Sequence, residues 1–124
     1  MKRSMMQAYV KGSKEAVELY LQAFDATLGF NVKDTDNTFY HAELDICGHI
    51  LAVSEAKDGT DKRITGNTMQ FCLHYGEGNE DMVKNAYEIL KEDSEIRFPL
   101  GPCDFSPLCA DFIDKFGIRW CLFV

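Results

Sequence analysis

The order of predicted elements repeats once along the sequence, and this repeat constrains the fold more than any other feature. In each half a strand pattern precedes an amphipathic helix, and three strand patterns follow it. The predicted strands lie at 5–10, 27–32, 38–46 and 49–55 in the first half, and at 68–75, 96–100, 108–113 and 118–124 in the second. Ser13 and Asn79, the expected helix N-caps, lie about half of the 124-residue chain apart. The sequence therefore predicts an α+β fold of two β-α-β-β-β units.

Both predicted helices carry an apolar stripe at helical spacing, which is typical of a helix packed against a sheet. The stripes comprise Ala16, Leu19, Tyr20, Ala23 and Phe24 in the first helix, and Met82, Val83, Ala86, Tyr87 and Leu90 in the second. Between the two repeats lies a polar segment at 56–67, which suits a crossover loop. We therefore expect one domain spanning 1–124, with a first module at about 1–58 and a second at about 67–124.

Composition excludes several classes of protein. Thirteen Lys and Arg residues against twenty Asp and Glu give a formal net charge of −7, which repels nucleic-acid phosphates and anionic lipid surfaces. Apolar runs fall far short of the roughly 18 residues that a membrane helix needs, and the first residues do not resemble a secretion signal. The five cysteines never form C-x-x-C, as expected of reduced thiols. We expect a cytoplasmic protein with no nucleic-acid or membrane partner.

Three segments share residues with a known superfamily. They are residues 15–20 with Ala23-Phe24, His41-Ala42-Glu43-Leu44 leading through Gly48 to Ser54-Glu55, and the run 114–120 (Asp-Lys-Phe-Gly-Ile-Arg-Trp), which Pro99-Leu100 precedes. Together they resemble the vicinal oxygen chelate superfamily of glyoxalase I, bleomycin-resistance proteins and extradiol dioxygenases, and more narrowly its PhnB-like branch. The resemblance covers essentially the whole chain.

This resemblance implies the glyoxalase/bleomycin-resistance fold, in which the modules form a curled, half-open mixed sheet with the helices on its convex face. It also implies a concave cavity between the modules, which is the default site for a small-molecule ligand. Members of the superfamily usually pair modules within or between chains. The apolar edge strands here favour a homodimer.

The resemblance further implies four metal-ligand positions, one on the first and one on the last strand of each module. The residues at these positions are Met5 or Gln7, about Ala52, about Gln70, and Cys121. They do not supply the three donors that a zinc ion needs, nor the oxygen or imidazole donors that a hard divalent ion prefers. We therefore expect no metal and no other cofactor, with His41, His49 and His74 as the remaining candidate ligands.

Alternation along 38–46 places His41 and Glu43 on the strand face opposite Ala42 and Leu44. They either face the cavity, where the carboxylate would orient the imidazole, or belong to an ordinary exposed polar face. Cys121 is either a nucleophile promoted by Arg119 or an inert buried thiol. Phe105 stands where PhnB-like relatives have an aromatic residue bordering the cavity. The expected ligand-binding residues are Gln7, Tyr9, His41, Glu43, Gln70, Phe105 and Cys121.

Three functions stay open at this point. The leading hypothesis is a PhnB-like protein whose metal-poor cavity binds a small organic molecule, with sequestration or resistance as one form of this. The alternative is a metal-dependent enzyme of glyoxalase, isomerase or lyase type, with Glu43 or Glu55 as the base. A purely structural dimerisation module is the third. Nucleotide-binding and hydrolase motifs do not occur in the sequence, and no catalytic residue is assigned.

Overall fold

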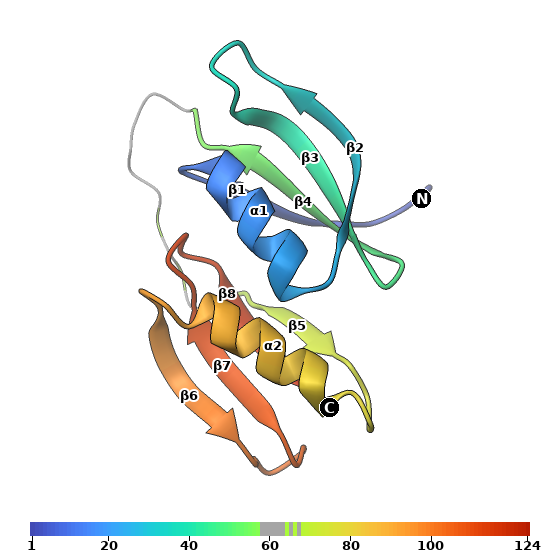
Figure 1. The fold of residues 1–124 in the computed structure, drawn as a ribbon, viewed down its shortest axis with the longest axis vertical. Coiled ribbons are helices and arrows are strands. Elements are labelled where there is room, and N and C mark those ends of the chain that lie inside the picture. The colour runs from blue at the N-terminus through green and yellow to red at the C-terminus, as the bar shows by residue number, and fades with distance from the viewer. Residues whose placement is uncertain (58–63, 65, 67) are drawn as a thin grey trace. The chain divides into compact units, whose positions relative to one another are not determined.

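The computed structural model describes residues 1–57, 64, 66 and 68–124, and the chain divides into two compact units, Met1–Ile64 and Thr65–Val124 (Figure 1). The first unit contains β1 (Met6–Val10), α1 (Ser13–Ala23), β2 (Thr27–Lys33), β3 (Phe39–Ile46) and β4 (His49–Glu55). The second contains β5 (Phe71–His74), α2 (Glu80–Leu90), β6 (Glu95–Gly101), β7 (Cys109–Ile113) and β8 (Arg119–Phe123). The predicted β-α-β-β-β repeat is confirmed, whereas the crossover loop expected at 56–67 lies largely outside the described residues.

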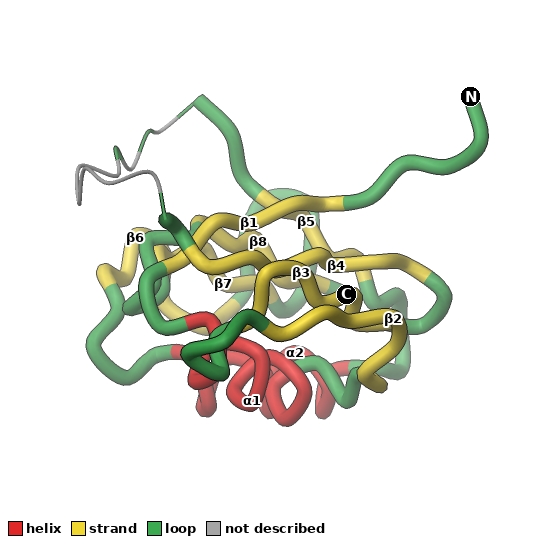
Figure 2. Tube along the Cα trace, turned by 90° about the horizontal axis from the view of Figure 1, so that it is seen from above, coloured by secondary structure: helices red, strands yellow, loops and turns green. Residues whose placement is uncertain are grey.

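Each unit has one four-stranded mixed sheet, and the two sheets share the same strand order. The orders are β1-β4-β3-β2 and β5-β8-β7-β6. The first and last strands of each unit pair in parallel, with Gln7 opposite Ala52 and Cys72 opposite Cys121. The remaining pairs are antiparallel, and one helix lies on one face of each sheet (Figure 2). The predicted α+β fold class is confirmed.

The core of the first unit lies between α1 and its sheet. Ala16, Tyr20, Ala23 and Phe24 of the predicted stripe are buried, Leu19 is partly exposed, and Tyr20 stacks on Phe24 with the ring centroids 5.8 Å apart. The apolar sheet residues on the helix side alternate along their strands, as expected for strands with one face on a helix. They are Ala8 and Val10 on β1, Ala42, Leu44 and Ile46 on β3, and Leu51 and Val53 on β4. Glu43, Ala52 and Ser54 on the opposite face are buried as well.

In the second unit α2 packs on β8, and the segment 114–120 has a structural role. Asp114 Oδ1 accepts hydrogen bonds from the backbone N–H groups of Phe116 and Ile118, at 2.9 and 3.0 Å. Its Oδ2 accepts one from the indole Nε1 of the fully buried Trp120 at 2.8 Å. One carboxylate therefore holds both the β7–β8 turn and the largest core side chain.

Two predicted boundaries differ from the structure. The N-cap of α1 is Gly12 in a left-handed conformation, and Ser13 is the first helical residue and caps nothing with its side chain. The Ser13 hydroxyl instead accepts a hydrogen bond from the backbone N–H of Phe39 at 2.9 Å, so the Ser13 prediction is wrong. Strand β5 is shorter than the predicted 68–75.

Among the described residues, no helix is both long enough and apolar enough to cross a bilayer.

Candidate functional site

The first sheet presents a set of polar side chains on the face that α1 does not cover. Because side chains alternate along a strand, these residues lie on the face opposite the apolar side chains that pack on α1. In the strand register Gln7 lies opposite Ala52, and Ala52 lies opposite Glu43, which forms one row across β1, β4 and β3. We call this surface the polar face, and it comprises Gln7, Tyr9, His41, Glu43 and Ser54. The structure thus places four of the predicted site residues on the same sheet.

Glu43 is the centre of the polar face, and it lies in a charged network. Arg3 donates from Nη1 to Oε2 at 2.8 Å and from Nη2 to Oε1 at 2.7 Å, which is a bidentate pair. His41 Nε2 contacts Oε1 at 3.1 Å. Only 6% of Glu43 is exposed. The Arg3 hydrogen bonds, followed by that of His41, lower the pKa of Glu43 to about 2 despite its burial.

This pKa bears on the expected role of Glu43 as a base. A general base works best when its pKa is near the operating pH, and a carboxylate with a pKa of about 2 accepts a proton poorly at neutral pH. Both oxygens of Glu43 are also occupied by Arg3 and His41. The geometry therefore favours a role for Glu43 in positioning Arg3 and His41 over a role in proton transfer.

The Glu43 contact also assigns the donor nitrogen of His41. A carboxylate only accepts hydrogen bonds, so His41 Nε2 is the donor in this contact, and Nδ1 is an acceptor when the ring carries one proton. The His41 side chain is 24% exposed, and its ring lies 6.2 Å from that of Phe30. Gln7 Nε2 donates to Ser54 Oγ at 3.2 Å. The polar face thus combines an oriented imidazole, a hydroxyl and the exposed ring of Tyr9, and the exposed ring of Phe30 lies beside His41.

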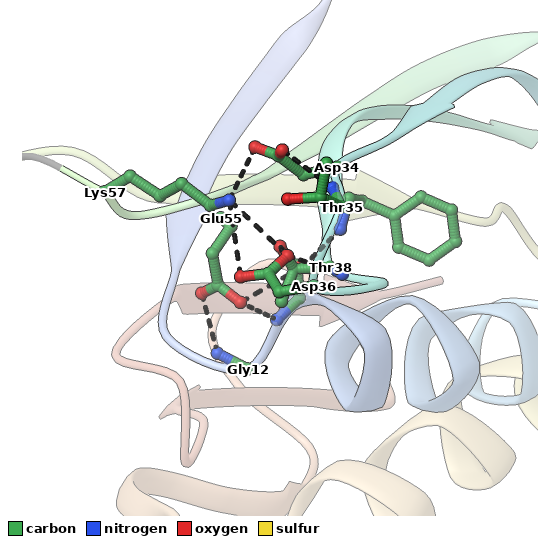
Figure 3. A network of polar contacts seen from close by, with 9 residues as sticks. Gly12, Asp34, Thr35, Asp36, Thr38, Glu55 and Lys57 are labelled. Carbon is green, nitrogen blue, oxygen red and sulfur yellow. Dashed lines mark hydrogen bonds and ion pairs between the residues drawn. The ribbon is translucent and has the colours of Figure 1, made fainter.

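Glu55, the other expected base, caps helix α1 (Figure 3). Its Oε2 accepts from the backbone N–H of Gly12 at 2.9 Å, and its Oε1 accepts from the backbone N–H of Ser13 at 3.2 Å. A carboxylate at this end also interacts favourably with the helix dipole. Glu55 therefore accepts hydrogen bonds from the first N–H groups of α1 in place of the predicted Ser13 cap. We interpret its role as stabilising the start of this helix.

Lys57 joins two acidic residues of the β2–β3 turn in the same region (Figure 3). Its Nζ lies 2.6 Å from Asp34 Oδ2 and 3.4 Å from Asp36 Oδ2. Hydrogen bonding to Lys57 lowers the pKa of Asp34, and hydrogen bonding to Thr38 lowers that of Asp36. Exposed pairs of this kind contribute little stability. We interpret this cluster as support for the turn.

The remaining predicted site residues, Gln70, Phe105 and Cys121, belong to the second unit. Gln70 directly precedes β5, and its buried Nε2 has no hydrogen-bond acceptor among the described residues. Phe105 is exposed in the loop between β6 and β7, and its ring meets Phe123 edge-on at 5.3 Å. Burial raises the pKa of Cys121 to about 11, which keeps its thiol protonated at neutral pH and favours the inert-thiol interpretation.

The implied metal positions do not supply a suitable donor set. Ala52 has no donor atom, and it is the direct register partner of Gln7. His49 is exposed at the start of β4, and the ring of His74 stacks on Phe123 at 4.5 Å. The described residues contain no group of three or more His, Cys, Asp or Glu side chains that could hold an ion. The residues present do not fit a catalytic divalent metal.

Arg3, Ser54 and Phe30 belong to the site but were not expected from the sequence. Arg3 reaches Glu43 across 40 residues from a segment with no periodic pattern. Ser54 and Phe30 lie beside predicted site residues on neighbouring strands, so strand pairing would have identified them. The tight hairpin at 47–48 fixes how β3 and β4 pair, and this pairing could have placed Ser54 on the same face as His41 and Glu43.

No protein-family model matches the sequence, and no curated protein matches it. Solved structures are similar along nearly the whole chain. The PhnB protein from Bacillus cereus has 20% identity and a TM-score of 0.80, covering 99% of this chain and 98% of that chain. The protein PA1353 from Pseudomonas aeruginosa has 19% identity and a TM-score of 0.76, covering 98% and 97%.

The fosfomycin resistance protein FosX from Listeria monocytogenes, in the E126Q form with Mn(II) and 1S,2S-dihydroxypropylphosphonic acid, has 15% identity and a TM-score of 0.66. That match covers 98% of this chain and 87% of that chain. At these identities the similarity shows the fold. The chain therefore has the glyoxalase-like vicinal oxygen chelate fold that the PhnB and FosX proteins share.

Proposed function

We propose that this protein binds a small organic molecule at the polar face of its first sheet, without a catalytic metal, and that it acts by binding or sequestration. The observation that carries this proposal is the Arg3–Glu43–His41 network on a face that the helix does not cover. Its sheet places the His41 imidazole beside the exposed ring of Phe30, with the exposed ring of Tyr9 two strands away on the same face.

The network favours binding because it fixes His41 before a ligand arrives. Glu43 is nearly buried, and a buried charge is tolerated only when it is paired. The pairing holds the imidazole from one side and leaves Nδ1 as an acceptor. A side chain that is already ordered loses less entropy on binding, so its hydrogen bond contributes more to affinity.

The chemistry of the face suggests the class of ligand. Tyr9 and Phe30 are 63% and 65% exposed, and they offer aromatic surface to a planar or apolar group. His41 Nδ1 would accept a hydrogen bond from a hydroxyl or amine on the same molecule. The net charge of −7 disfavours polyanions. These features fit a neutral or weakly basic organic molecule with a hydrogen-bond donor.

The FosX structure contains Mn(II) and a phosphonic acid. The described residues contain no group of three or more His, Cys, Asp or Glu side chains that could bind such an ion. Ala52, which has no donor side chain, occupies one of the metal-ligand positions that the family resemblance implies. We therefore do not extend that chemistry to this chain. Elemental analysis after incubation with Ni, Zn, Mn and Fe tests this part of the proposal, and stoichiometric retention of one of these metals would overturn it.

A thermal-shift screen against metabolites and antibiotics tests the binding itself. A ligand at a hundred times its dissociation constant stabilises the protein by about 2.7 kcal/mol. We expect His41→Ala to abolish the shift of any hit and Tyr9→Ala to reduce it. His49→Ala is the matched control, because His49 is exposed at the start of β4, and it should retain the full shift. A shift that is unchanged in both His41→Ala and Tyr9→Ala would refute the proposed face.

A further inference from the structure

The segment that precedes β1 is joined to the polar face by one side chain. Residues 1–5 have no regular secondary structure, and residues 1–4 are exposed. Figure 2 shows this segment on the side of the first sheet that faces away from α1. Among the described residues, Arg3 makes the side-chain hydrogen bonds that connect this segment to the sheet, and both go to Glu43. We call residues 1–5 the N-terminal arm.

We propose that Arg3 holds the place of the cationic group of a ligand, and that an aromatic amidine or guanidine binds the polar face by displacing Arg3 from Glu43. This inference rests on the proposed function, because it names a class of ligand for the same face. It adds a movement of the N-terminal arm, which releases Glu43 before or as that ligand binds.

The two members of the ion pair differ in exposure, and this difference indicates which one can leave. The Arg3 side chain is 52% exposed, whereas the Glu43 side chain is 8% exposed. Arg3 can move into water without breaking strand pairing, because it precedes β1. Glu43 has no such freedom, since a nearly buried charge is tolerated only when it is paired. Glu43 therefore exchanges one cation for another and is not left without one.

The geometry at Glu43 selects the shape of the incoming cation. Arg3 donates to both carboxylate oxygens, at 2.8 and 2.7 Å, so the acceptors are arranged for two parallel N–H groups. Amidines and guanidines carry such a pair of donors in one plane, whereas an ammonium group does not. An incoming amidinium can thus replace both hydrogen bonds that Arg3 withdraws.

The surroundings of Glu43 favour an aromatic body on the same ligand. The Phe30 ring lies 6.2 Å from the His41 ring, and 65% of Phe30 is exposed. His41 contacts Glu43 Oε1 directly, so this contact does not depend on Arg3. The net charge of −7 also favours cations over anions. The face therefore offers a bidentate acceptor with an aromatic surface beside it.

Displacement of Arg3 makes a quantitative prediction for affinity. A ligand that binds only when Arg3 has left has its apparent affinity reduced by the fraction of molecules in that open form. If Arg3 occupies Glu43 in about 90% of the molecules, removal of the Arg3 guanidinium raises the affinity about tenfold. A ligand that binds beside an intact Arg3–Glu43 pair gains nothing from this change.

Titration of the full chain with benzamidine at neutral pH, followed by NMR of the backbone amides, tests the proposal. Benzamide has the same shape without the charge and is the control compound. In the wild-type protein we expect benzamidine, and not benzamide, to shift the amide signals of Glu43 and of the N-terminal arm. Arg3→Gln should bind benzamidine about tenfold more tightly than the wild type. Lys2→Gln is the matched control, because it removes the same charge from an exposed residue of the arm, and it should keep wild-type affinity.

A double variant, Arg3→Gln with Glu43→Gln, tests the role of the carboxylate without leaving a buried charge unpaired. It should bind benzamidine no better than benzamide. Equal or weaker benzamidine affinity in Arg3→Gln relative to the wild type would overturn the proposal. So would a wild-type protein in which benzamidine leaves the arm signals unshifted, or which binds benzoate more tightly than benzamidine, since Arg3 would then serve an anion. These wild-type titrations decide the matter even if a variant fails to fold.

Failure of this inference is distinguishable from failure of the proposed function. If hits from the thermal-shift screen lose their shift in His41→Ala while Arg3→Gln gains no affinity for benzamidine, the polar face binds ligands and Arg3 is a fixed part of it. If the hits keep their shift in both His41→Ala and Tyr9→Ala, the proposed function fails whatever benzamidine does.

Discussion

Replacing Glu55 with Gln separates a structural from a catalytic role for this residue. The substitution keeps the size of the side chain and one carbonyl oxygen, but it removes the charge and replaces the second oxygen with an amide nitrogen. Glu55 uses one oxygen for Gly12 and the other for Ser13. In Glu55→Gln one of these backbone N–H groups therefore faces a donor instead of an acceptor.

The loss can be sized from these contacts. Ser13 is fully buried, so water cannot replace a lost acceptor there. A buried donor left without its acceptor costs about 1–3 kcal/mol, and loss of a charge at a helix N-terminus costs about 0.3–1 kcal/mol. We expect Glu55→Gln to lower the free energy of unfolding by about 2 kcal/mol in total. For a chain of this length that corresponds to a fall in Tm of roughly 8 °C.

Urea unfolding followed by circular dichroism measures this difference through the midpoint and the slope. Glu18→Gln is the matched control, because Glu18 is exposed on the same helix, and it should stay within about 0.5 kcal/mol of the wild type. A Glu55→Gln protein as stable as this control would refute the capping role. If ligand binding were lost at the same time, Glu55 would have to be reassigned to the site.

Two further predictions concern buried and partly buried carboxylates. Asp114→Asn should destabilise the second unit by about 2–3 kcal/mol, because the amide cannot accept at both former oxygens, and fluorescence of Trp120, the single tryptophan, reports the unfolding. The pKa of Glu43 falls from its ordinary value of 4.5 to about 2 in the fold, so its contribution to stability is fully present above about pH 4.5 and is lost as the pH falls toward 2. Arg3→Gln should flatten this part of the acid profile, as measured by urea midpoints at several pH values, and an unchanged profile would show that Arg3 does not hold Glu43.

Elements that depend on local periodicity were predictable from the sequence. Alternation along β3 predicted that Ala42 and Leu44 would be buried with His41 and Glu43 on the opposite face, and the structure has this arrangement. The turn at Cys47 and Gly48 was predicted as well, and both residues have the positive φ angles that a tight hairpin requires. These features are set by neighbours in the sequence.

Contacts between distant residues were not predictable in the same way. Ser13 has the side chain of a good N-cap, but its hydroxyl is used by Phe39, and Glu55 reaches the helix across 42 residues. Strand β5 starts later than expected, and its register places Cys72 opposite Cys121, a pairing that the sequence did not predict. Local propensity contains no information on such pairings, because they depend on how strands align in the sheet.

The parallel pairing of β1 with β4 also has a consequence for how the first unit forms during synthesis. The residues of this pair, such as Gln7 and Ala52, are 45 positions apart, whereas β3 and β4 are joined by a two-residue turn. Contacts of long sequence separation carry the larger loop-closure cost, so they are made late. A growing chain can complete this sheet only after β4 has left the ribosome, and until then both edges of β1 are unpaired and available to chaperones.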